Sequence, residues 1–445
     1  MSSADPEHSR RSWAASPGLS ALAALVTLVA MLLFARVKVR ALEWSFDYPL
    51  MSHEDPTRAL FLFAEEERRV VQSKLVPRWL STPGGCSACD APSLAKRWRE
   101  LLEEHQRYVD EGYRRHKTAR WVREAEAARA ISLAGWGDAE EIRAASALAG
   151  ADLPQYLSDR AAEIARGDVL AERARARRSG QLTLLSTVLH FAFMLFALGA
   201  LLAWKRGLRY PRRSARSRLV TPTLGRGLVI FVWAEGFVSV MTRLRWDNPD
   251  GPLEIFRMLP SLALALSVSV LLLGTRTAST DSPITALMRC PPDRRSRRFM
   301  WGAAIASIGA VYAFNWVHWR LVHWLGVLPL WSDGLRETEL YGSLARALLA
   351  RFSAVIIAPF AEELTYRGVL FGSLATRMST HRAALISCIV FASVHGYGWY
   401  GFASVALCGY LWARLAARTG SLVPGMLAHG TFNLVISIFR LAVRA

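Results

Sequence analysis

Three apolar stretches in the last third of this 445-residue chain contain ionisable and amide side chains. The set consists of Glu362, Glu363 and Arg367 in the stretch 352–372, His395 directly after 383–394, and His429 and Asn433 in 422–443. Such groups are costly inside a bilayer and usually mark a functional site. These residues are therefore the first candidates for a catalytic site.

The spacing of these residues is helical. Glu363 and Arg367 are four positions apart, so they share a helix face and can form an ion pair. Glu362 is rotated by about 100° from its neighbour and is free to point elsewhere. His429 and Asn433 are also four positions apart, and they can present an imidazole and an amide to one point.

Phe391 and His395 repeat the four-residue spacing, which places an apolar ring beside an imidazole. With a rise of 1.5 Å per residue, Glu363, His395 and His429 lie roughly 12–18 Å from the ends of their helices on one side of the membrane. Three helices can therefore bring a carboxylate, two imidazoles and an amide to one level.

This combination of groups suits hydrolysis by an activated water molecule. A carboxylate withdrawn from solvent can deprotonate water, and imidazole and amide N–H groups can stabilise the oxyanion that forms. No Ser or Cys is clearly arranged as a nucleophile, and the sequence contains no HExxH motif. A polar network that only holds helices together is the structural alternative, but two imidazoles and a second carboxylate exceed what it needs.

The apolar pattern predicts the elements that position these groups. Nine stretches approach the ~20 residues that a helix needs to cross a bilayer. They are 17–35, 182–204, 227–241, 258–274, 300–319, 352–372, 383–394, 401–417 and 422–443. We therefore expect an all-α, polytopic membrane bundle with about nine transmembrane helices and a helical extramembrane insert, located in the inner (plasma) membrane.

Composition divides the chain into four parts. We expect a cytoplasmic tail and signal-anchor helix at 1–35, a polar helical extramembrane domain at 36–181, accessory transmembrane helices at 182–341 and a catalytic membrane core at 342–445. The basic segments 205–218 and 275–298 predict the cytoplasmic side, which places 36–181 on the other side.

The net charge of +19 does not indicate nucleic-acid binding, because the basic residues lie between apolar runs. We expect the lipid bilayer as their partner instead. Cys86 and Cys89 form a CxxC pair with no second pair to complete a zinc site, so a redox or disulfide role is left open.

The segments around the candidate residues resemble the CPBP family of intramembrane proteases (CAAX proteases and bacteriocin-processing or Abi proteins), which includes the type II CAAX prenyl endopeptidases. Residues 358–368 contain its EExxxR motif, 391–395 its FxxxH motif and 419–433 its HxxxN motif with a Thr-Gly-Ser-Leu lead-in. Tyr366 departs from the Phe that is common before Arg-Gly. Each motif alone is weak, but three in order within apolar helices are specific.

The resemblance implies an endopeptidase that cuts membrane-bound protein or peptide substrates. It implies that Glu362, with His395, activates water, that His429 and Asn433 form the oxyanion site, and that Glu363, Arg367 and Phe391 support them. The alternatives are a non-catalytic bacteriocin-immunity or scaffold protein that retains the pocket, and a transporter, which would want an inverted repeat that the sequence does not show.

The candidate residues leave the need for a metal open. We expect no cofactor, because the set suits water activation without a metal and Asn433 is a poor zinc ligand. Zinc is the alternative, and its ligands would then be Glu362, His395 and His429.

Overall fold

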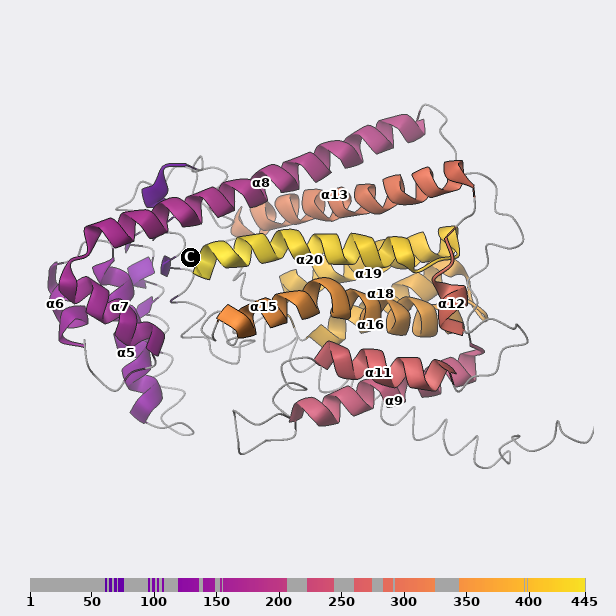
Figure 1. Ribbon diagram of the computed structural model, residues 1–445, viewed down its shortest axis with the longest axis horizontal. Coiled ribbons are helices and arrows are strands. Elements are labelled where there is room, and N and C mark those ends of the chain that lie inside the picture. The colour runs from indigo at the N-terminus through magenta and orange to yellow at the C-terminus, as the bar shows by residue number, and fades with distance from the viewer. Residues whose placement is uncertain are drawn as a thin grey trace, which may run out of the picture.

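The protein is described by a computed structural model. It describes scattered residues between 61 and 107 and then residues 119–135, 139–148, 153, 155–205, 222–243, 260–273, 283–290, 293–324, 344–395, 397 and 399–444. All regular structure in these ranges is helical, which confirms the expected all-α class (Figure 1). The predicted span 17–35 and the pair Cys86 and Cys89 lie outside the described residues.

Three short helices of the polar zone gather at one end of the elongated molecule. They are α5 (Ala119–Ala134), α6 (Ala139–Ala147) and α7 (Gln155–Arg166) (Figure 1). Their apolar faces form a small core that includes the fully buried Ile131 and Leu157. This part of the chain therefore packs around a core of its own, as expected for a helical insert.

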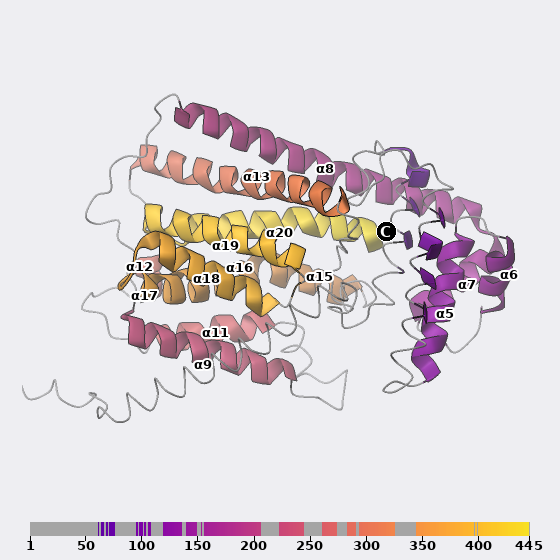
Figure 2. The same ribbon diagram turned by 180° about the vertical axis from the view of Figure 1, so that it is seen from behind.

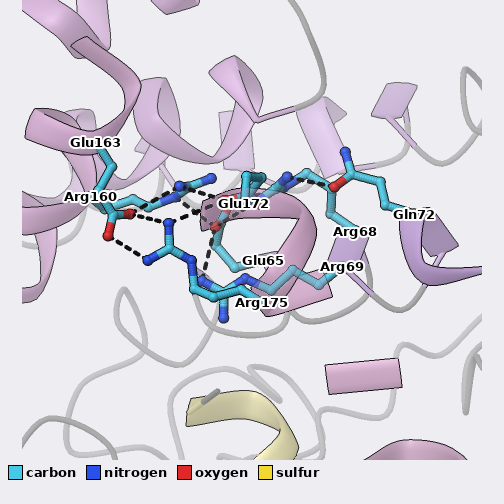
Figure 3. Close-up of polar contacts among 8 residues, drawn as sticks. All are labelled: Glu65, Arg68, Arg69, Gln72, Arg160, Glu163, Glu172 and Arg175. Carbon is cyan, nitrogen blue, oxygen red and sulfur yellow. Dashed lines mark hydrogen bonds and ion pairs between the residues drawn. The ribbon is translucent and has the colours of Figure 1, made fainter. Parts of the chain in front are cut away.

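A buried ion-pair network joins this polar unit to the long helix α8 (Val169–Lys205) (Figure 3). Glu65 lies 2.8 Å from Arg68 and 3.0 Å from Arg160. Glu172, in the first turn of α8, approaches the same two guanidinium groups at 2.6 and 2.7 Å. The beginning of α8 is therefore fixed to the polar unit by charge.

Glu65 makes the stability of this unit depend on pH. Burial alone would raise the pKa of Glu65, but the neighbouring guanidinium groups, chiefly that of Arg68, lower it from 4.5 to about 2. Its ionised form therefore stabilises the fold above about pH 4.5, by on the order of 3 kcal/mol, and this contribution is lost as the pH falls toward 2. Thermal melting of the full-length protein should show the loss, and Glu65→Gln should already be destabilised near neutral pH. Equal melting of both proteins at neutral pH would contradict this.

Helix α8 continues from the polar unit into the apolar bundle without a break, so the expected boundary between residues 181 and 182 falls inside one helix. Composition changes there from polar to apolar, but no proline interrupts the helix. Its segment Glu172–Leu202 is long and apolar enough to cross a membrane, and only 6% of its most apolar window is buried. Leu195 is 67% exposed, as expected for a side chain that faces lipid.

The described part of the chain contains one further helix that is long and apolar enough to span a bilayer, Arg294–His318 within α13 (Arg294–Trp324). Two shorter apolar segments, Ser261–Leu273 and Val423–Ile438, accompany them. The described residues thus contain two clear spans and do not confirm the expected nine.

The remaining helices surround the segment that carries the first motif. That segment consists of α15 (Leu344–Phe352), η5 (Ser353–Ile357), α16 (Ala358–Glu362), η6 (Glu363–Phe371) and α17 (Gly372–Leu374). Helices α9 (Leu224–Arg243) and α11 (Pro260–Leu273) lie on one side of it, and α8 and α13 lie on the other, as both views show (Figures 1 and 2). Helices α18 (Thr380–His395), α19 (Trp399–Thr419) and α20 (Val423–Arg444) complete the bundle, and the short α12 (Pro283–Leu287) packs at its end.

The motif segment is not the regular α-helix that its spacing predicted. Its η5 and η6 parts are π-helical, so their hydrogen bonds reach one residue further back. The amide of Ala358 donates to the carbonyl of Ser353, five residues earlier, and Pro359 has no amide to donate. The proline therefore favours the wide turn, a deviation that occurs frequently at functional sites.

Candidate active site

Glu362, His395 and His429 converge from three helices. Glu362 ends α16, His395 ends α18, and His429 lies in the second turn of α20. The Oε2 atom of Glu362 is 4.0 Å from Nε2 of His395 and 3.7 Å from Nε2 of His429. The side chains of Glu362 and His395 are 17% and 20% exposed. Three of the four predicted catalytic side chains therefore meet.

The ring orientation of His395 follows from its backbone contact. Its Nδ1 lies 2.7 Å from the carbonyl oxygen of Phe391. A carbonyl can only accept, so we assign the proton of the neutral ring to Nδ1. The neutral imidazole then presents the lone pair of Nε2 toward Glu362. Two acceptors thus face each other across 4.0 Å.

His429 lies between the two adjacent glutamates. Its Nδ1 is 3.4 Å from Oε1 of Glu363, and its Nε2 faces Glu362. The ring stacks on Trp412 with 4.4 Å between centroids. Both nitrogens therefore face carboxylate oxygens, and a neutral ring can donate its one proton to only one of them.

Glu363 and Arg367 form a buried ion pair at 3.3 Å, in which the side chains are at most 1% exposed. The guanidinium group lies over the ring of Phe391 at 4.1 Å, which stabilises a cation held away from water. A side chain at Gly425 would come within 2.8 Å of the Glu363 carboxylate, so only glycine lets α20 approach this closely. Glu363 thus has a guanidinium partner that Glu362 lacks, although both glutamates lie beside an imidazole.

Asn433 has a different contact from the one that its spacing predicted. Its Nδ2 donates to the carbonyl of Ala354 at 2.7 Å. In the π-helical turn Ala358 bonds to Ser353 instead, and Pro359 has no amide, so neither residue donates to this carbonyl. Asn433 therefore caps an oxygen that the wide turn leaves without a backbone donor, whereas His429 faces the glutamates.

Asn433→Ala is expected to lower the free energy of unfolding by about 1–3 kcal/mol, because the Ala354 carbonyl loses its donor. Adding Pro359→Ala supplies an amide at the position that bonds to Ala354 in a π-turn. This second substitution should restore part of the stability and turnover, with Pro359→Ala alone as the control. A purely oxyanion-binding Asn433 would show no such rescue.

The placed residues do not fit a tetrahedral zinc ion. Zinc ligands at 2.0–2.1 Å from the metal lie about 3.3 Å from one another. The separations from Glu362 to the two imidazoles are 3.7 and 4.0 Å. Within the described ranges no group of three His, Cys, Asp or Glu side chains has the geometry to hold a metal.

One carboxylate near the site was not singled out from the sequence. Glu235, in the apolar helix α9, accepts a hydrogen bond of 2.5 Å from the hydroxyl of Tyr366. The sequence could have indicated Glu235, because a carboxylate inside the apolar stretch 227–241 is as unusual as one in the stretch that contains Glu362.

Two carboxylates and two imidazoles therefore converge inside an all-helical bundle. Residues 344–435, about a fifth of the chain, match the family model described as type II CAAX prenyl endopeptidase Rce1-like. This match confirms the resemblance of the segment to CPBP-family intramembrane proteases, and the segment contains every candidate residue predicted from the motifs. Comparison with curated proteins and with solved structures gives no match.

Proposed function

We propose that this protein is an intramembrane endopeptidase that hydrolyses peptide bonds of membrane-associated proteins with a water molecule activated by Glu362 and His395. The observation that carries the proposal is the pair of acceptors, Oε2 of Glu362 and Nε2 of His395, 4.0 Å apart. The Rce1-like match over residues 344–435 supports protease activity in general.

The separation of these acceptors suits a shared water molecule. At 4.0 Å they are too far apart for a direct hydrogen bond. A water molecule between them has two hydrogens and can donate one to each acceptor. Its oxygen lone pair then points away from both, toward a substrate carbonyl. The arrangement therefore orients a nucleophile.

The reaction follows from these positions. Glu362 takes one proton from the water as its oxygen bonds to the substrate carbonyl carbon. His429 donates the proton of its Nε2 to the oxyanion and stabilises it. The protonated Glu362 then gives its proton to the departing amine as the carbon–nitrogen bond breaks. Glu363 and Arg367 hold the motif helix, and Asn433 holds η5, so these three residues position the reacting groups.

The membrane setting is part of the proposal. We place about nine helices across the inner membrane, with 36–181 outside the cytoplasm and the substrate entering from the bilayer. The exposed apolar face of α8 and the apolar length of α13 support this arrangement.

The proposal is tested in cells by comparing membrane proteins in the presence of the wild-type protein and of Glu362→Gln. Truncated fragments of at least one membrane protein should appear with the wild-type protein alone. Identical fragments in both strains would contradict peptide-bond hydrolysis at this site and favour a non-catalytic immunity or scaffold role.

A further inference from the structure

A hydrogen bond ties the motif helix to a helix outside the matched segment. The hydroxyl of Tyr366 in η6 donates to Oε1 of Glu235 in α9 at 2.5 Å, across 131 residues of sequence. Tyr366 is 1% exposed, so solvent does not satisfy this hydroxyl. Glu235 lies outside residues 344–435, and nothing in the three motifs predicts it.

The ring of Tyr366 continues this contact to the imidazole of His395. Tyr366 meets Phe391 edge-on with 4.9 Å between centroids, and Phe391 meets His395 edge-on at 4.7 Å. Phe391 is 2% exposed, and its carbonyl accepts the Nδ1 proton of His395. Because interiors are close-packed, a displaced Tyr366 ring would shift Phe391 and, with it, both contacts that orient the imidazole.

Helix α18, which contains Phe391, also holds the backbone of Tyr366. The hydroxyl of Ser387, one turn before Phe391 in α18, donates to the Tyr366 carbonyl at 2.9 Å. The main chain is therefore fixed to α18, while the far end of the side chain is fixed to α9. Glu235 supplies the acceptor that the buried Tyr366 hydroxyl needs.

We infer that Glu235 is a positioning residue of the proposed protease. Through the hydroxyl of Tyr366 and the ring of Phe391 it sets the orientation in which His395 faces Glu362. Helix α9 thereby contributes to the reaction although it carries none of the reacting groups. The inference rests on the proposed function, because His395 is the group that it positions.

The test compares four variants of the full-length protein. Glu235→Leu removes the acceptor and is expected to lower kcat by about 10- to 100-fold with little change in KM, since small misplacements of a reacting group have effects of this size. Glu235→Gln keeps an oxygen acceptor and should retain most of the turnover. Tyr366→Phe removes the hydroxyl and should lower kcat as Glu235→Leu does, and the double variant Glu235→Leu/Tyr366→Phe should be no more impaired than Glu235→Leu alone, because both substitutions break the same hydrogen bond.

A second readout is independent of cleavage. The ¹⁵N resonances of the His395 ring, assigned through their loss in His395→Gln, report its tautomer and titration. They should shift in Glu235→Leu and by a similar amount in the double variant. A wild-type protein that cuts no peptide would refute the proposed function, while the resonances would still test the coupling. Unchanged resonances and kcat in Glu235→Leu, or a double variant whose loss of kcat is the sum of two independent losses, would overturn the inference.

Discussion

Replacing Glu362 by glutamine is expected to lower turnover by about 10²–10⁴-fold and to leave the protein folded in the membrane. The amide has nearly the shape of the carboxylate but cannot take a proton from water. The imidazoles beside it, at 3.7 and 4.0 Å, do not depend on a full negative charge for their positions, because Phe391 and Trp412 hold them. The loss should therefore appear in kcat and not in stability.

The measurement is turnover per folded molecule, with the folded fraction taken from gel filtration and thermal melting. The matched control is His381→Gln, because His381 lies on the same helix as His395 and bonds to Tyr410 near the exposed end. This control should retain normal turnover. Near-normal turnover in Glu362→Gln would show that another group is the base.

Replacing Glu363 by glutamine should instead destabilise the protein by on the order of 3–5 kcal/mol, because it leaves a buried guanidinium group without its counter-charge. Glu363 is fully buried, and Arg367 is held at 3.3 Å from it between aromatic rings. Yield and melting temperature should fall, and activity should fall in proportion to the folded fraction.

The double variant Glu363→Gln/Arg367→Met separates this effect from catalysis. It removes both charges, and replacing a buried ion pair by uncharged groups is often neutral for stability. Melting should recover toward that of the wild-type protein. A stable Glu363→Gln variant with no turnover would contradict the structural role and assign the chemistry to Glu363.

The convergence of three helices could be predicted from the sequence because charged groups are rare in apolar stretches. Glu362, His395 and His429 each lie in or directly beside such a stretch, and the structure brings both imidazoles within 4.0 Å of Glu362. The cost of burying such groups is large enough to outweigh local propensity, so their positions carry information about tertiary structure.

The contacts of Asn433 and Glu235 could not be predicted in the same way. The prediction for Asn433 assumed a regular helix, but the π-helical turn at Pro359 changes which carbonyl needs a donor. Glu235 stands out as a carboxylate in an apolar stretch, yet its donor lies 131 residues away and only packing joins the two. Spacing within one helix says nothing about such pairs.

Composition could not predict where the last helix of the polar zone ends, for a related reason. Composition changes near residue 181, but α8 passes through that point as one helix because backbone hydrogen bonds do not depend on side-chain polarity. The ion pairs of Glu172 join the two parts, and one of its partners, Arg68, lies far away in the sequence.

The central claim is tested most directly by incubating the purified protein, reconstituted in liposomes, with membrane-bound peptides in H₂¹⁸O and identifying new termini by mass spectrometry. The wild-type protein should release peptides whose new carboxyl termini each contain one ¹⁸O atom, and Glu362→Gln should release almost none. No new termini with the folded wild-type protein, or equal numbers with both proteins, would contradict hydrolysis by water activated at Glu362.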